Sequence, residues 1–249
     1  MIKKIIYYLY REMEKKRRLK KYIGYNIASN GENMRKYAEW IKGHVGENIH
    51  NIFEIGANYA QDAEVLAEEF NVLPDEIYVF EAHPDICKTI KKIHKFHAYN
   101  NAVYNEKKEM SFNICDVKSE NTGMSSLLDS NKTAYNKTGI VQAIRMDDFM
   151  YENDIKEIDF VKIDVEGCNY EVLEGFGNRI KDIHCIQIEA DHIENWKGEH
   201  LWRDIYKMLV HSGFELVLFD RQYTQSDSLW INKLFWEKYT NIFNEKEQL

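Results

Sequence analysis

From about residue 50 onward, short apolar runs rich in Ile, Val and Phe alternate with longer segments whose apolar residues recur at helical spacing. This alternation is typical of a parallel β-sheet whose strands are joined by crossover helices. Only two prolines occur, and no Gly/Ser-rich or Pro-rich linker divides residues 40–240. We therefore predict an α/β fold built on a seven-stranded, doubly wound sheet, with N-terminal helices packed outside it.

The predicted strands are the short apolar runs, and the last two are expected to form an antiparallel hairpin at the sheet edge. Residues 118–138 are polar and should form a long loop, which we expect to act as a lid. An added β segment is expected at 109–115. The other strands are expected at 51–55, 77–80, 98–103, 160–163, 185–188, 215–219 and 228–232, and helices at 60–70, 84–93, 170–176 and 201–210.

The charge is unevenly distributed along the chain. The formal net charge is −8, which argues against general nucleic-acid binding, yet residues 1–22 hold nine Lys or Arg against two Glu. We expect a basic helical appendage over residues 1–40 and a single domain over 41–249. Three roles remain open for the basic segment: peripheral contact with an anionic membrane, contact with substrate phosphates, or packing as a solvated helix on the acidic body.

Two further features bear on where the protein works. The apolar run at residues 5–9 is too short for a signal-peptide core or a membrane span, so a cytoplasmic location is expected. The four cysteines form no C-x-x-C pair, which argues against a zinc or redox site and favours buried thiols in a reducing compartment. No pattern in the sequence specifies an oligomeric state.

In an open α/β sheet, ligands bind beyond the carboxyl ends of the strands. The first strand leads through Glu54 to Gly56, which permits a tight turn and a close approach of backbone N–H groups to a ligand. The second ends at Glu81, whose carboxylate suits the two hydroxyls of a ribose. The pyrophosphate-binding pattern G-x-G-x-x-G is absent, which disfavours an NAD-linked dehydrogenase. A nucleoside without phosphates, S-adenosylmethionine, is the favoured ligand.

Five short segments, in this order, carry a resemblance to a known family: Phe53–Asn58, Phe80–Pro84, Asn101–Val103, Gly123–Leu127 and Lys162–Gly167. Together, across about residues 50–190, the chain resembles FkbM-type methyltransferases. The resemblance implies a class I, Rossmann-like methyltransferase fold that uses S-adenosylmethionine. It also implies O-methylation, often of a sugar hydroxyl in a glycan or natural product.

The resemblance assigns cofactor contacts by position. It places the methionine end of the cofactor near the turn after the first strand, the ribose on the acid of the second, and the adenine beside the third. The implied cofactor-binding residues are Glu54, Gly56, Ala57, Asn58, Asp62, Glu81, Ala82, Asn101, Ala102 and Ser125. The chain departs from the family pattern at Ala60, where glycine is usual, at Asp62, where a hydroxyl residue is usual nearby, and at Glu54, where Asp is common.

The expected catalytic residues follow the next two strands. Asp164 should lie at a strand end beside the transferring methyl group and act as a general base, while Glu166 either assists it or orders the turn. Glu189 and His192 should face the same crevice, and imidazole titrates near neutral pH. A divalent ion held by Asp164, Glu189, Asp191 and His192 is an alternative that we do not favour, because only the ligand types support it.

Four aromatic residues in the last third of the chain have two interpretations. They form either a platform on which a sugar stacks or part of the core. They are Trp196, Trp202, Tyr223 and Trp230.

These observations predict an S-adenosylmethionine-dependent O-methyltransferase. Its acceptor is expected to be a hydroxyl of a carbohydrate, free, phosphorylated or nucleotide-linked, in the biosynthesis of a capsule, lipopolysaccharide or other cell-surface glycan. The alternative is a non-catalytic Rossmann-like assembly partner in a biosynthetic complex, because a fold alone does not determine function. The predicted convergence of Asp164, Glu189 and His192 on one crevice favours the enzyme.

Overall fold

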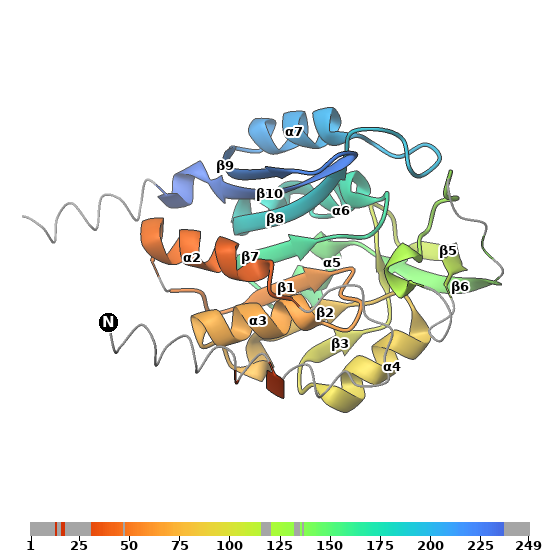
Figure 1. Cartoon of the computed structure of the whole chain (residues 1–249), viewed down its shortest axis with the longest axis horizontal. Helices are drawn as coiled ribbons and strands as arrows, with labels where there is room; N and C mark the ends of the chain where they lie inside the picture. Colours follow the sequence, from red (N-terminus) through yellow and green to blue (C-terminus); the bar gives the residue numbers. More distant parts are fainter. Residues whose placement is uncertain are drawn as a thin grey trace, which may run out of the picture.

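The computed structural model describes residues 13, 16–17, 31–46, 48–115, 121–131, 135 and 137–236. A seven-stranded sheet in the order β3-β2-β1-β7-β8-β10-β9 runs through its centre (Figure 1). Strands β3, β2, β1, β7 and β8 are parallel, and β10 is antiparallel to both neighbours, which confirms the predicted sheet and its C-terminal hairpin. The strands are β1 (Ile52–Ile55), β2 (Ile77–Phe80), β3 (His97–Tyr99), β7 (Ile158–Ile163), β8 (Ile183–Asp191), β9 (Phe214–Arg221) and β10 (Gln225–Asn232).

Helices cover both faces of this sheet. One face packs against α2 (Met34–His44), α3 (Gln61–Phe70) and α4 (Pro84–Ile93), and the other against α5 (Met146–Glu152), α6 (Asn169–Gly175) and α7 (Trp202–His211). Successive residues of a strand point to opposite faces, so Ile52 joins the first core and Phe53 the second. Because the central strands are buried on both faces, they appear in the sequence as continuous apolar runs.

A second, smaller sheet was only partly predicted. The strand expected at 98–103 is divided: β3 belongs to the large sheet, whereas β4 (Ala102–Val103) pairs with β6 (Lys137–Ile144). The added β segment is confirmed as β5 (Lys108–Ile114), which completes the order β4-β6-β5. The sequence interpretation predicted neither β6 nor α5. In β6 only Val141 and Ala143 are buried, and Ile140 is 70% exposed, so this strand lacks the continuous buried run of the central strands.

The described part of the predicted lid is fastened on both sides. Ser126 forms a β-bridge with Asn113 and donates a hydrogen bond from Oγ to the carbonyl of Glu166 at 2.6 Å. Ser130 forms a second bridge with Trp196. Residues 121–131 therefore form a wall rather than a free lid, and residues 118–120, 132–134 and 136 of the predicted loop lie outside the described residues.

Most of the expected appendage over residues 1–40 also lies outside the described residues. The described helix α2 crosses the expected boundary at residue 40 and packs on α3 through buried Tyr37, Ala38 and Ile41. No helix in the described part of the chain is long and apolar enough to cross a membrane.

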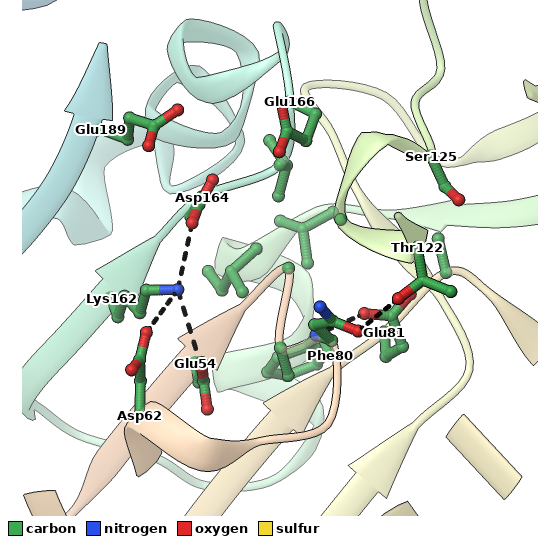
Figure 2. A pocket seen from close by; sticks show the side chains of 18 of the residues that line it. Glu54, Asp62, Phe80, Glu81, Thr122, Ser125, Lys162, Asp164, Glu166 and Glu189 are labelled. Atoms are coloured by element: carbon green, nitrogen blue, oxygen red, sulfur yellow. Dashed lines mark hydrogen bonds and ion pairs between the residues drawn. The ribbon is translucent and has the colours of Figure 1, made fainter. Parts of the chain in front are cut away.

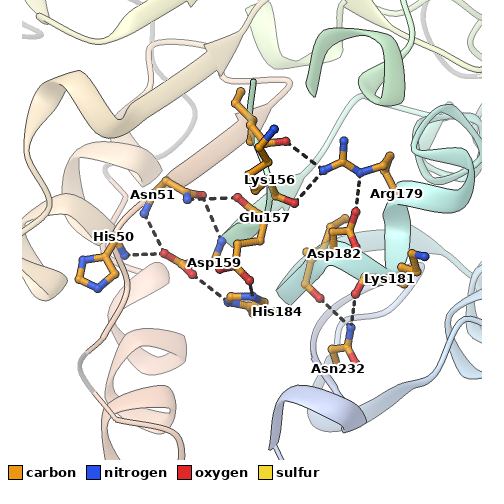
Figure 3. A network of polar contacts seen from close by, with 12 residues as sticks. His50, Asn51, Lys156, Glu157, Asp159, Arg179, Lys181, Asp182, His184 and Asn232 are labelled. Carbon is orange, nitrogen blue, oxygen red and sulfur yellow. Dashed lines mark hydrogen bonds and ion pairs between the residues drawn. The ribbon is translucent and has the colours of Figure 1, made fainter. Parts of the chain in front are cut away.

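Polar contacts join the strands at their amino ends (Figure 3). Asp159, at the start of β7, accepts hydrogen bonds from the backbone N–H groups of His50 at 2.7 Å and Asn51 at 3.0 Å, and pairs with His184 Nδ1 at 2.8 Å. Burial raises the pKa of Asp159, but these contacts outweigh burial and leave it below its usual value. At this end of the sheet, hydrogen bonds and the contact with His184 thus compensate the buried carboxylate of Asp159.

Candidate functional site

A cavity of about 350 Å³ opens at the carboxyl ends of β1, β2, β7 and β8 (Figure 2). Its walls also include the small sheet, the loop at 121–127 and the connection between β9 and β10. Small-molecule sites typically measure roughly 300–1,000 Å³, so the cavity suits a ligand of that size. Its position is the one that the sheet topology predicts for a ligand.

The cavity brings together nearly all of the predicted site residues. All ten predicted cofactor-binding residues line it, as do three of the four predicted catalytic residues. They are Glu54, Gly56, Ala57, Asn58, Asp62, Glu81, Ala82, Asn101, Ala102 and Ser125, together with Asp164, Glu166 and Glu189.

His192 does not line the cavity. Glu189 faces the cavity from β8, whereas Ile188 and Ala190 point to the opposite core, and His192 continues on their side. Its ring lies 6.0 Å from that of Trp202 and 6.2 Å from that of Phe219, and burial lowers its pKa. The expectation that His192 faces the crevice is therefore wrong. The alternative metal site that included it does not form, and no group of three or more His, Cys, Asp or Glu within the described ranges is arranged to hold a metal ion.

The turn after β1 requires glycine. Gly56 has φ +80°, and a Cβ there would lie 1.8 Å from the carbonyl oxygen of Asp164. The backbone N–H groups of Gly56 and Ala57 donate to the carbonyl of Phe80 at 3.0 and 3.1 Å, which holds the turn across β2. Ala60 adopts a left-handed conformation with φ 58°. Glycine adopts this conformation without strain, which accounts for the glycine usual at this position.

Glu81 directly follows β2, and its buried carboxylate faces the cavity (Figure 2). It accepts hydrogen bonds from the backbone N–H groups of Asn58 at 2.6 Å and His83 at 2.7 Å. Burial raises its pKa to about 7 in spite of these bonds. A carboxylate has about four lone-pair sites, so Glu81 keeps acceptor capacity for a ligand diol.

Lys162 lies at the centre of a buried ionic cluster (Figure 2). Its Nζ is 2.9 Å from Asp62 Oδ2, 3.2 Å from Asp164 Oδ2 and 3.7 Å from Glu54 Oε1. Burial alone would lower the pKa of Lys162, but the three carboxylates raise it well above its usual value. Burial raises the pKa of Glu54 to about 8, although Lys162 opposes this.

Lys162 is not among the site residues predicted from the sequence, although the sequence holds one signal for it. A lysine stands in an otherwise apolar strand, directly opposite Glu54 in the register of β1 and β7. Neighbouring residues in register share one face of a sheet, so a buried strand with such a lysine requires acidic partners.

Three further carboxyl groups that line the cavity lie beyond this cluster. Burial, followed by the charges of Asp164 and Asp191, raises the pKa of Glu166 well above its usual value. Burial and the charges of Asp164 and Glu166 do the same for Glu189. Asp227, from β10, has its pKa raised to about 6, first by burial and then by Asp164.

Three cavity residues from the hairpin were also missed: Gln222, Gln225 and Asp227. Because β10 is antiparallel to β8, its first residues lie at the edge where the parallel strands end. The predicted antiparallel hairpin implies this position, whereas the predicted catalytic residues all follow the carboxyl ends of predicted parallel strands.

The four aromatic residues do not form a platform at the cavity. Trp196 and Trp230 are buried core residues, and a Cβ on Gly167 would lie 2.6 Å from the Trp196 ring. Tyr223 is 97% exposed, and none of the four lines the cavity. For Trp196 and Trp230, the interpretation as core residues is confirmed.

Comparison with known proteins gives one family match. Residues 44–216, well over half of the chain, match the model of the methyltransferase FkbM domain. No curated protein matches the chain.

Solved structures resemble the chain at low identity. The FkbM methyltransferase of Methylobacillus flagellatus is 11% identical with a TM-score of 0.48, over 74% of this chain and 43% of that one. The chain thus spans less than half the length of that protein. The Synechocystis magnesium protoporphyrin IX methyltransferase with bound S-adenosylmethionine is 9% identical with a TM-score of 0.44, over 82% and 79% of the chains. M. capricolum TrmK with bound S-adenosylhomocysteine is 15% identical with a TM-score of 0.44, over 84% and 70%.

The family match defines a methyltransferase of the Rossmann-like class that uses S-adenosylmethionine. The chain belongs to the FkbM methyltransferase family, which confirms the predicted resemblance and the predicted cofactor. The cavity fits this cofactor: the turn at Gly56 allows close backbone approach, and Glu81 retains lone pairs for a diol. In addition, Asp62 Oδ1 is a buried acceptor at the cavity with no hydrogen-bond partner within the described structure.

Proposed function

We propose that the protein transfers a methyl group from S-adenosylmethionine to a hydroxyl of a carbohydrate acceptor in cell-surface glycan biosynthesis, such as that of a capsule or lipopolysaccharide. The observation that carries this proposal is the position of Asp164. It lines the same cavity as the predicted cofactor-binding residues, and Lys162 fixes its carboxylate at 3.2 Å. An unactivated alcohol needs such a base, because its proton must leave as the new bond to carbon forms.

The remaining chemistry requires mainly alignment. The sulfonium of the bound cofactor supplies an activated methyl group, and the protein orients the reactants and excludes water. The carbonyl of Asp164 packs against Gly56, so the base is positioned by the turn that contacts the cofactor. Asp164 accepts the hydroxyl proton while Lys162 holds its carboxylate in place.

The part of the cavity wall formed by β8, β10 and the connection before β10 suits an acceptor with several hydroxyl groups. Glu189, Gln222, Gln225 and Asp227 provide carboxylate acceptors and amide donors at the cavity. Sugar hydroxyls both donate and accept hydrogen bonds, so this wall suits a sugar better than an apolar acceptor.

The proposal extends to the chain as a whole. The methyltransferase domain comprises residues 41–249 together with the first turns of α2, and the residues before α2 form an appendage. The enzyme works in the cytoplasm as a protein that does not bind nucleic acid. Where the acceptor is nucleotide-linked, the lysines and arginines of residues 1–22 contact its phosphates, or they contact an anionic membrane surface.

The first test is isothermal titration of S-adenosylhomocysteine into the parent, Glu81→Ala and the control Glu76→Ala, whose glutamate is exposed just before β2. We expect micromolar binding by the parent and the control, and a loss of at least about tenfold in Glu81→Ala. The parent is then assayed for S-adenosylhomocysteine release on a panel of sugars, sugar phosphates and nucleotide sugars. Absence of binding, or binding without turnover on any sugar, would contradict the proposal and favour a non-catalytic assembly partner.

A further inference from the structure

The cavity is strongly acidic. Seven carboxylate side chains line it, and among the described residues Lys162 is the only cationic side chain that does so. The carboxylates are Glu54, Asp62, Glu81, Asp164, Glu166, Glu189 and Asp227.

Only part of this charge is compensated. Lys162 contacts Glu54, Asp62 and Asp164, and Glu81 is held by two backbone N–H groups. No Lys, Arg or His in the described ranges forms an ion pair with the remaining three, Glu166, Glu189 and Asp227. The carboxyl groups without a cationic partner are therefore concentrated on the side of the cavity formed by β8, β10 and the turn after β7.

Glu189 and Asp227 lie directly opposite each other in the register of β8 and β10. Such cross-strand neighbours have Cβ atoms about 4.5–5.5 Å apart, and like charges there are destabilising. Neutral amides hold both carboxylates in place: Gln225 Nε2 donates to Glu189 at 2.7 Å, and Gln187 Nε2 donates to Asp227 at 2.8 Å. Hydrogen bonds therefore orient the two side chains, and neither pairs with a cation in the described structure.

An unsatisfied polar atom lies directly behind these two carboxylates. Gln187 is completely buried, and its Oε1 has no hydrogen-bond partner in the described structure. Because Nε2 of the same amide donates to Asp227, this orphaned oxygen lies beside the Asp227 carboxylate. Gln187 does not line the cavity, so this oxygen lies behind the wall and only the two carboxylates face a ligand. A protonated primary amine has three N–H donors for this pair of acceptors.

The cofactor's own ammonium group does not account for this wall. The resemblance places the methionine end of the cofactor at residues 54–58, next to β1. Strands β8 and β10 are the second and third strands from β1 on that side, and at a spacing of about 4.8 Å they lie roughly 10–14 Å away. That separation corresponds to the acceptor's part of the cavity.

We propose that Glu189 and Asp227 bind a protonated primary amine of the acceptor, so that the substrate is an amino sugar or another amine-bearing polyol. This inference rests on the proposed function, because it names the substrate class of the same site. A phosphate placed against this wall would meet three uncompensated carboxylates. Any phosphate of the acceptor therefore lies outside the inner part of the cavity.

The test uses the full chain saturated with S-adenosylhomocysteine and three probes in saturation-transfer NMR titrations: glucosamine, N-acetylglucosamine and glucose 6-phosphate. Glucosamine carries the charge, and N-acetylglucosamine keeps the shape without it. We expect glucosamine to bind at least about tenfold more tightly than either of the others. Glu189→Gln and Asp227→Asn should each lose about tenfold for glucosamine, and the exposed control Asp154→Asn should lose nothing.

Binding of S-adenosylhomocysteine, measured on the same samples, separates the two proposals. A parent protein that does not bind it contradicts the proposed function. A parent that binds it but shows no preference for glucosamine, or variants that bind glucosamine as the parent does, overturns the amine inference alone. Preferential binding of glucose 6-phosphate overturns it as well.

Discussion

Buried carboxylates at the two ends of the central sheet have opposite environments. At the amino end, Asp159 is compensated by two backbone N–H groups and His184, and its pKa is lowered (Figure 3). At the carboxyl end, three carboxylates share Lys162 (Figure 2). The pKa of Glu189 beyond them is raised well above its usual value. The same strands, β1, β7 and β8, contribute to both ends.

This difference separates stability from function. At the amino end, Asn232 donates to the carbonyls of Lys181 and Ile183, and Arg179 donates to those of Ile155 and Lys156, so polar groups join strands and loops. Uncompensated carboxylates at the other end reduce stability, and groups with perturbed pKa values cluster at functional sites. Substitutions at the two ends should therefore have separable effects on folding and on catalysis.

The largest expected effect is on turnover. Asp164→Asn removes the proposed base but keeps the side chain's shape, so turnover on the sugar acceptor should fall about 10²- to 10⁴-fold. Affinity for S-adenosylhomocysteine should change by less than about threefold, because the proposed role is in proton transfer rather than cofactor binding. The matched control is Asp154→Asn, an exposed aspartate that also pairs with a lysine two residues away. Full turnover by Asp164→Asn would exclude Asp164 as the base.

The next largest effect is on folding and tests the ionic cluster. Lys162→Met leaves three carboxylates without their shared cation, and breaking a buried ionic contact in this way typically costs about 3–5 kcal/mol. The raised pKa of Lys162 means that its contribution is complete at neutral pH and is lost only as pH rises above about 10.4, the unfolded lysine value, through the folded one.

Urea unfolding at pH 7 measures this cost. The control Lys156→Met removes an exposed lysine that pairs with Asp154 and should change the free energy of unfolding by less than about 1 kcal/mol. Equal effects of the two lysine substitutions would show that the cluster around Lys162 contributes no more than a surface ion pair.

The sequence predicted the cofactor half of the site better than the acceptor half. Gly56 and Glu81 are local signals, because each follows its own strand and needs only the sheet topology to be interpreted. Lys162 and Asp227 depend on register: the first lies opposite Glu54, and the second lies opposite Glu189 only because β10 is antiparallel. Register is a property of strand pairs, which hydrophobic runs alone do not specify.

The wrong prediction for His192 and the missed strand β6 also have physical causes. A shift of one residue along β8 moves a side chain to the other face, so a histidine just past the strand end faced the wrong side of the sheet. β6 lies in a small sheet whose buried face is formed by few residues, among them Phe112 and Val141. Its apolar pattern was therefore weaker than that of the central strands.

A smaller loss of stability should follow from a change at the amino end. Asp159→Asn removes a charge that accepts two backbone hydrogen bonds and pairs with His184, which should cost about 1–3 kcal/mol. Because the folded pKa of Asp159 is lowered, its contribution is present above about pH 4 and is lost as pH falls through the folded value. The difference from the parent should therefore shrink in acid.

Thermal unfolding at pH 7 and pH 3 measures the stability of Asp159→Asn, and titration of S-adenosylhomocysteine measures its affinity for the cofactor product. Glu157→Gln is the matched control, because Glu157 also contacts His184 but is 61% exposed, and it should cost less. Cofactor-product affinity should stay within about twofold of the parent in both variants, since neither residue lines the cavity. A large loss of affinity in Asp159→Asn would mean that the two ends of the sheet are coupled.

The smallest expected effect is a gain in stability rather than a loss. It tests directly whether carboxylates at the carboxyl end of the sheet, unlike Asp159 at the amino end, destabilise the fold. The folded pKa of Asp227 is raised to about 6, so its carboxylate destabilises the fold once it ionises. The stability associated with its protonated form is complete below the unfolded value of about 4 and is lost as pH rises through about 6. Asp227→Asn should therefore match the parent at pH 4 and be more stable by about 1–2 kcal/mol at pH 7.5. This gain requires no new contact, because Gln187 already donates to the side-chain oxygen that the substitution retains.

Urea unfolding at pH 4, 5.5 and 7.5 follows this gain across the window in which it should appear. The control is Asp220→Asn on β9, directly opposite Asp227 in the register but 55% exposed and paired with Lys36, and it should stay within about 1 kcal/mol of the parent at every pH. A variant that is less stable than the parent at pH 7.5 would mean that the Asp227 charge is compensated, as that of Asp159 is. A variant that is more stable but binds glucosamine less tightly would show that this wall retains a destabilising carboxylate because its acceptor requires it.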